Sequence, residues 1–209
     1  MAEYVDKKIQ DGNVLLEVVR KYQNELAEVG VDADFISDFE AKINAVIEKD
    51  TAQREAGNYI RQKTVEQNQQ LQRARNCIRK IKTAAKDVYY GNQDMLKEFH
   101  IGGKSVTTVK GTLTELAYFK EKVSSRLSDL AASGISEADI TELDACMSTL
   151  SDVDSDQENG KRLRTTATNE RKAALKALAE VMYRVRKKAE IRFAGNKNIL
   201  NEFRTIIVH

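Results

Sequence analysis

The chain has 209 residues and a formal net charge of +2, so its overall charge gives no general attraction to a polyanion. Apolar residues make up 41% of the sequence, which is enough for a buried core. There is no proline, so we expect long, uninterrupted helices. No window approaches a membrane-spanning run, and the charged N-terminus lacks the apolar core of a signal peptide. We therefore expect a cytoplasmic protein that does not enter a membrane.

The first part of the chain predicts two amphipathic helices separated by a glycine. Over residues 4–29, apolar side chains recur at spacings of three and four, which is typical of a helix with one buried face. Gly30 is placed to end this helix in a left-handed conformation, and Asp32 or Asp34 can cap the next one. The second apolar pattern fades near Asp50, where we expect the second helix to end.

A third helix follows a polar stretch, residues 51–70, in which large apolar residues are few. Its apolar residues include spacings of seven, which indicate coiled-coil-like packing. They are Leu71, Ala74, Ile78, Ile81, Ala85 and Val88. The polar stretch leaves two possibilities open: a helix continuous from about Ala52, or one that is broken near Gly57 and, in the second copy described below, near Gly160.

A helix stop and a linker close this first pattern. Gly91 and Asn92 tolerate positive φ and are interpreted as the end of the third helix, before a short cap helix over residues 95–99. Residues 100–105 contain two adjacent glycines and are interpreted as an interdomain hinge.

The whole pattern occurs twice. A shift of 104 positions aligns residues 26–99 with residues 130–203 without a gap and gives 16 identities, and the apolar positions of the helices coincide as well. We therefore predict an all-α protein formed by tandem duplication of a three-helix unit plus a short cap helix. The expected units are residues 1–103 and 104–209, packed as one pseudo-twofold bundle with coiled-coil-like seams and a shared core.

Charge is also distributed in the same way in both repeats, with an acidic second helix and a basic third helix. One interpretation is that these helices are neighbours whose charges complement each other. The other is that the basic faces bind nucleic acid or another polyanion. The candidate polyanion-binding residues are Arg75, Arg79, Lys82, Lys86, Arg184, Arg186 and Lys187. Few aromatic residues are interleaved with them, which favours the first interpretation.

Metal-ligating and catalytic groups are scarce. The only histidines are His100 and His209, and Cys77 and Cys146 occupy positions that do not correspond between repeats. We expect reduced cysteines that behave as small apolar residues, and no catalytic, cofactor or metal site. Residues 152–158 begin with the carboxylate spacing of a calcium loop but lack its glycine and its final glutamate. This stretch is interpreted as a solvated connection between helices, with a weak cation site as the open alternative.

The predicted function is therefore non-enzymatic: protein–protein interaction or a scaffold role, with another protein or a second copy as the partner. The alternative is nucleic-acid or polyanion binding through the basic third helices. A third possibility is a bundle enzyme or metal carrier that uses recurring glutamates at the pseudo-twofold axis.

Overall fold

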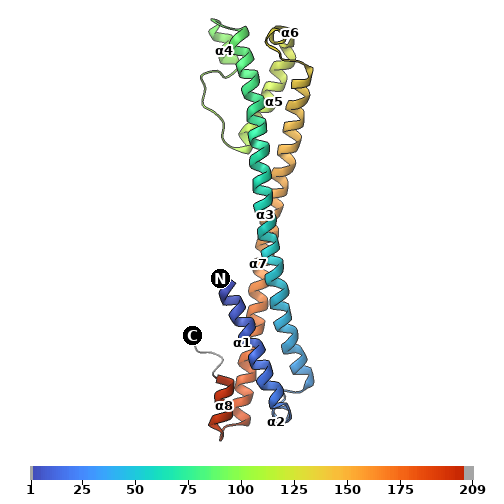
Figure 1. Ribbon diagram of the computed structural model, residues 1–209, viewed down its shortest axis with the longest axis vertical. Coiled ribbons are helices and arrows are strands. Elements are labelled where there is room, and N and C mark those ends of the chain that lie inside the picture. Colours follow the sequence, from blue (N-terminus) through green and yellow to red (C-terminus); the bar gives the residue numbers. More distant parts are fainter. Residues whose placement is uncertain (1, 205–209) are drawn as a thin grey trace. The chain divides into compact units, whose positions relative to one another are not determined.

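The computed structural model describes residues 2–204, and residues 1 and 205–209, which include His209, lie outside the described part. Within it the chain is helical and has no strand, which confirms the predicted all-α class (Figure 1). In chain order the elements are α1 (Ala2–Lys21), α2 (Gln23–Ala27), α3 (Ala33–Val88), α4 (Gln93–Glu98), α5 (Val109–Ser125), α6 (Leu127–Leu130), the 3-10 helix η1 (Ala131–Ser133), α7 (Glu137–Arg192) and α8 (Lys197–Arg204). None of these helices combines the length and apolar character needed to cross a membrane.

The second and third predicted helices of each repeat are one continuous helix, so the predicted boundary near Asp50 is wrong. α3 and α7 have 56 residues each and continue through Gly57 and Gly160. The polar stretches contain many good helix formers, and one interior glycine costs only about 1 kcal/mol. Because the chain has no proline to remove a backbone hydrogen bond, nothing in these stretches ends the helix.

The first predicted helix, residues 4–29, is interrupted at Tyr22, which has φ −112° and ψ 25° and separates α1 from α2. The predicted glycine stop is confirmed, since Gly30 and the corresponding Gly134 have φ of +76° and +79°. Asp32 is the capping residue of α3, because its Oδ1 accepts a hydrogen bond of 2.9 Å from a backbone N–H three residues later.

The predicted stop at Gly91 is confirmed by a φ of +83°. Asn92 then caps α4, since its side chain accepts a hydrogen bond from the N–H of Met95. The corresponding Gly195 is not left-handed, so the prediction of a glycine cap of the same kind in the second repeat is wrong.

The chain divides into two compact units whose limits differ from the predicted division at residues 103 and 104. Unit 1 comprises Met1–Asn58 and Leu163–His209, and unit 2 comprises Tyr59–Arg162. Each unit therefore combines the N-terminal part of one long helix with the C-terminal part of the other. The segment at residues 100–105, predicted to be an interdomain hinge, lies inside unit 2.

Each unit has a core of its own. In unit 1, α1 lies beside the first part of α3 and the last part of α7, and their buried side chains form one cluster (Figure 1). In unit 2, buried side chains of α5, the last part of α3 and the first part of α7 form the other cluster. The predicted seam of the third helix is part of the unit 2 core. Its buried members are Leu71, Ala74, Ile78, Ile81 and Ala85.

Acidic and basic segments do pair, but the structure pairs them across repeats. In unit 2, Arg73 Nε lies 2.8 Å from Glu142 Oε1, and Lys80 forms an ion pair with Asp139. Arg73 and Lys80 belong to the basic part of the first repeat, whereas the two acids belong to the second repeat. Complementary charge thus accompanies the packing of each basic segment against the acidic segment of the other repeat.

Candidate anion-binding site

A pocket of about 390 Å³ lies in unit 2, between the last part of α3 and the segment that joins α4 to α5. Four of its lining residues are basic and one is acidic. The basic ones are Arg75, Arg79, Lys82 and Lys86, and the acidic one is Glu115. All four candidate residues that the sequence indicated in the first repeat are therefore brought to one concave surface.

The helical register explains why these four side chains gather. Arg75, Arg79, Lys82 and Lys86 follow one another at spacings of four, three and four, which places them on one face of α3. Buried residues such as Ile78 and Ile81 hold the neighbouring face of the same helix in the core. The basic row thus lies along the border between the core of unit 2 and solvent.

The opposite wall is the segment over residues 99–108, which turns sharply after α4. His100 has φ +52° and Gly102 has φ +87°, so the backbone is left-handed at two points. Such a conformation is costly for most residues and free for glycine. Arg75 helps to hold this wall, because its Nη2 donates a hydrogen bond of 2.8 Å to the carbonyl oxygen of Thr107.

The pocket keeps unused hydrogen-bonding capacity on its basic side. Within the described part of the chain, Arg79 and Lys86 are exposed and form no ion pair with a carboxylate. The Nε atom of Arg75 is buried there without a hydrogen-bond partner. A buried donor without a partner is costly, and an acceptor that enters the pocket would remove that cost.

Glu115 offsets only part of this charge. Its Oε1 lies 2.7 Å from Lys82 Nζ, and the two side chains are 10% and 23% exposed. The Lys82 ammonium also lies 5.3 Å from the centre of the Phe119 ring, at cation–π distance. Lys82 is therefore held by two contacts. Arg79 donates from Nη1 to Asn76 Oδ1 at 3.1 Å, and Lys86 is exposed.

Sequence reasoning missed two residues of this pocket, His100 and Glu115. The His100 ring stacks on Tyr118, with centroids 4.5 Å apart and planes 11° apart, and its Nδ1 lies 4.0 Å from Glu115 Oε1. No spacing in the sequence relates residue 100 to residue 115. Their proximity depends on the turn at residues 99–108. The two adjacent glycines predicted a turn there, but not the direction in which the chain leaves it.

The candidate residues of the second repeat, Arg184, Arg186 and Lys187, lie in unit 1 and line no part of this pocket. Arg186 Nε donates to the carbonyl oxygen of Phe203 at 3.3 Å, and burial lowers the pKa of its guanidinium. Lys187 is hydrogen-bonded to Glu190 at 2.8 Å, which raises the pKa of the lysine.

The pocket also has no duplicate in sequence. The positions 104 residues after Arg75, Arg79 and Lys86 hold Ala179, Tyr183 and Glu190. Only Lys82 corresponds to a basic residue, namely Arg186. The row of basic residues along α3 is therefore not repeated at the same positions of the second repeat.

The acidic stretch at residues 152–158 is not a connection between helices, as the sequence predicted, but part of α7. Two of its carboxylates have partners on α3: Asp154 Oδ1 accepts from Gln67 at 2.7 Å, and Asp156 lies 3.0 Å from Lys63 Nζ. These side chains serve to join α3 and α7 within unit 2.

Comparisons with known proteins give no match, whether to protein-family models, to curated proteins or to solved structures.

Proposed function

We propose that this chain is a non-enzymatic binding protein that takes a multiply charged, phosphate-bearing anion in the basic pocket of unit 2. The observation that carries the proposal is the convergence of Arg75, Arg79, Lys82 and Lys86 on one pocket that contains a single carboxylate. The proposal favours the polyanion alternative of the sequence, but restricts it to one unit and one ligand-sized site.

The chemistry of the lining suits phosphate. Guanidinium groups donate two parallel hydrogen bonds to phosphate oxygens, and Arg75 and Arg79 are one helical turn apart. Lys82 and Lys86 add point charges farther along the same face. The volume of about 390 Å³ is within the range of small-ligand pockets, roughly 300–1,000 Å³.

A compact anion fits this pocket better than a nucleic-acid strand. Strand-binding proteins combine a basic groove with aromatic side chains on which successive bases stack. The aromatic rings beside His100 are those of Tyr118, on which His100 already stacks, and Phe119, which meets His100 edge-on at 5.8 Å. The four basic residues also occupy one pocket of unit 2, and three of them have no basic counterpart at the corresponding positions of unit 1.

We assign an interaction or scaffold role rather than turnover. The pocket concentrates fixed positive charge, which binds an anion but does not by itself transfer protons. Glu115 is held by Lys82 at 2.7 Å, and His100 is stacked on Tyr118, so both groups are engaged in structural contacts. The bound anion would be a free ligand or a phosphate group carried by a partner.

We further infer that the chain arose by tandem duplication. The bounds of α3 and α7 differ by 104 at both ends, and α4 and α8 begin 104 residues apart. This offset equals the shift that aligns the two halves of the sequence.

Isothermal titration calorimetry with tripolyphosphate tests the proposal. The wild-type protein should bind one equivalent, more weakly as salt is raised. The Arg79→Gln/Lys86→Gln variant should lose at least about tenfold in affinity, since each charge-assisted hydrogen bond contributes roughly 1.5–3 kcal/mol. The matched control is Arg184→Gln/Lys187→Gln in unit 1, which should bind like wild type.

Absence of binding by the wild-type protein would contradict the proposal, and so would equal losses in both variants. Tripolyphosphate should also be recovered intact after incubation with the protein. Hydrolysis that the Arg79→Gln/Lys86→Gln variant lacks would overturn the non-enzymatic assignment.

A further inference from the structure

A second group of reactive side chains lies in unit 2, away from the basic pocket. Cys77 of α3 faces Cys146 of α7 with their sulfur atoms 3.5 Å apart, and both are free thiols. Glu142, one turn before Cys146 on α7, places its Oε1 atom 3.8 Å from each sulfur. The three possible ligand atoms lie within 4.8 Å of one another.

The dimensions of this triangle match one face of a tetrahedral zinc site. Zinc–sulfur bonds of about 2.3 Å and a zinc–oxygen bond of about 2.1 Å at tetrahedral angles separate the two sulfurs by about 3.8 Å and each sulfur from the oxygen by about 3.6 Å. The observed separations of 3.5, 3.8 and 3.8 Å differ from these values by only a few tenths of an ångström. Small side-chain rotations are enough to place a zinc ion.

Solvent reaches the group from one side. A pocket of about 620 Å³ is lined by Cys77 and Glu142 together with Arg73, Asn76 and Lys80. Cys146 is buried behind them. This arrangement gives an ion a route of entry and leaves room for a water molecule as the fourth ligand.

A positively charged partner already orients the carboxylate. Arg73 donates from Nε to Glu142 Oε1 at 2.8 Å and from Nη2 to Oε2 at 3.0 Å. In metal sites, residues that do not touch the ion commonly hold its ligands in position by hydrogen bonds of this kind. The guanidinium also offsets the excess negative charge of two thiolates and one carboxylate around a doubly charged ion.

We propose that Cys77, Glu142 and Cys146 form a Zn²⁺-binding site in unit 2, with water in the fourth position. Thiolate ligands favour Zn²⁺ over harder cations such as Mg²⁺ and Ca²⁺. Binding releases the two thiol protons and involves no change in oxidation state. The sequence predicted no metal site, because the two cysteines are 69 residues apart and meet only through the packing of α3 against α7.

A disulfide is the competing fate of two thiols at this distance. It would require the sulfurs to approach to about 2.05 Å and would need a disulfide or peroxide as oxidant. Zinc coordination requires the smaller movement.

Unit 1 provides a control within the same chain. The positions that correspond to Glu142, Cys146 and Cys77 hold Asp38, Lys42 and Val181. In unit 1, Lys42 Nζ lies 3.1 Å from Asp38 Oδ1. An ion pair therefore occupies the positions that hold Cys146 and Glu142 in unit 2. The metal site is thus expected in unit 2 alone.

Titration of the reduced full-length protein with Co²⁺, a spectroscopic substitute for Zn²⁺, tests the proposal. We expect one equivalent to bind, with a sulfur-to-cobalt charge-transfer band and the intense visible bands of a tetrahedral site, and Zn²⁺ to displace it. Cys77→Ala should abolish the charge-transfer band or reduce it by about half or more. Glu142→Gln should weaken binding at least about tenfold.

Lys42→Ala, at the corresponding position of unit 1, should bind Co²⁺ like wild type. Circular dichroism establishes that each variant is folded, and Cys77 and Glu142 are both partly exposed, which favours tolerance of the changes. A folded, reduced protein without the charge-transfer band would overturn the proposal. So would binding that survives in Cys77→Ala/Cys146→Ala. If the reduced protein does not bind Co²⁺ and oxidised glutathione converts Cys77 and Cys146 to a disulfide, the pair has a redox role and the zinc proposal is wrong.

Discussion

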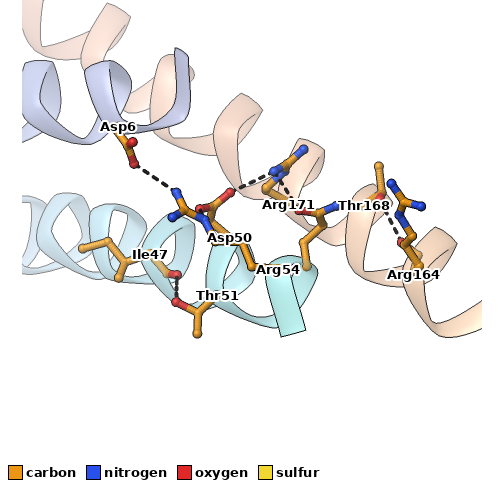
Figure 2. A network of polar contacts seen from close by, with 9 residues as sticks. Asp6, Ile47, Asp50, Thr51, Arg54, Arg164, Thr168 and Arg171 are labelled. Atoms are coloured by element: carbon orange, nitrogen blue, oxygen red, sulfur yellow. Dashed lines mark hydrogen bonds and ion pairs between the residues drawn. The ribbon is translucent and has the colours of Figure 1, made fainter. Parts of the chain in front are cut away.

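Asp50 accepts a hydrogen bond of 2.8 Å from Nη1 of Arg171, and both side chains are buried in unit 1 (Figure 2). Arg54 also reaches Asp50, at 2.7 Å. In unit 2 the positions 104 residues away are Asp154 and Gln67, and Gln67 Nε2 donates to Asp154 at 2.7 Å. The same contact between α3 and α7 is therefore made in each unit, once with a charged donor and once with a neutral one.

Breaking the buried pair should cost far more than breaking an exposed one. Asp50→Ala leaves the Arg171 guanidinium buried without its carboxylate, so we expect the free energy of unfolding to fall by about 3 kcal/mol. Asp38→Ala removes an ion pair with Lys42 whose side chains are 39–54% exposed, and should cost less than about 1 kcal/mol. Urea denaturation followed by circular dichroism compares the two variants. Equal costs would show that Asp50 and Arg171 do not act as a buried pair.

The interior glycines of the long helices should respond differently to alanine. A Cβ atom at Gly57 meets nothing within 4 Å, so Gly57→Ala should stabilise the protein by roughly 0.5–1 kcal/mol. A Cβ atom at Gly160 would lie 3.1 Å from Tyr59 and Ile60, so Gly160→Ala should give no gain or a loss. Thermal melts of both variants measure the difference. Destabilisation by Gly57→Ala would mean that α3 is broken at that residue.

The two Gly-Asn stops should also differ. Gly91 has φ +83°, so Gly91→Ala should destabilise the protein by about 1 kcal/mol or more. Gly195 lies outside the left-handed region and has open space around its Cβ position, so Gly195→Ala should be close to neutral. Chemical denaturation of the two single variants distinguishes them, and identical costs would contradict the assigned backbone conformations.

The ion pair between Glu98 and Lys122 should make stability depend on pH. The hydrogen bond from Lys122 holds the pKa of Glu98 below its ordinary value of 4.5. The folded state therefore favours the ionised carboxylate, and the pair stabilises the protein above pH 4.5 and ceases to do so as pH falls through the lowered pKa. Glu98→Gln should destabilise the protein at neutral pH and have progressively less effect in acid.

Lys122→Met is the matched variant for this pair. It should show the same loss at neutral pH, and the double variant should cost less than the sum of the two single changes. Additive costs, or a cost of Glu98→Gln that does not depend on pH, would rule out the pair as the cause.

Much of the local structure could be predicted from the sequence. Apolar spacing located the buried face of the third helix, from Leu71 to Ala85, and glycine chemistry located the stops at Gly30 and Gly91. The continuity of α3 could not be predicted with the same certainty. A polar stretch without an apolar face is compatible with a helix or with a break, because its helical state depends on propensity alone.

The division into units was harder, because periodicity identifies a buried face but not its partner. The charge pattern contained a signal: the basic segment at Arg73 and Lys80 complements the acidic segment at Asp139 and Glu142 of the other repeat. The same crossing places Cys77 opposite Cys146, which a comparison of equivalent positions within repeats could not reveal.

The candidate site was predicted in part. Helical spacing alone places Arg75, Arg79, Lys82 and Lys86 on one face, and the structure adds the wall that makes this face a pocket. His100 is part of that wall because its own backbone is left-handed. Left-handed backbone is uncommon for a residue other than glycine, and no sequence pattern predicts it here. The positions of Arg75, Arg79 and Lys86 hold Ala179, Tyr183 and Glu190 in the second repeat, so the basic row itself is not repeated there.

Nuclear magnetic resonance of the nitrogen-15-labelled protein, titrated with tripolyphosphate, tests whether unit 2 contains a single anion site. We expect the amide signals of residues 75–86 and 99–108 to shift progressively and to saturate at one equivalent, while those of α1 and α8 do not change. Shifts that are concentrated in unit 1, or spread over basic residues of both units without saturation, would contradict a single anion site in unit 2.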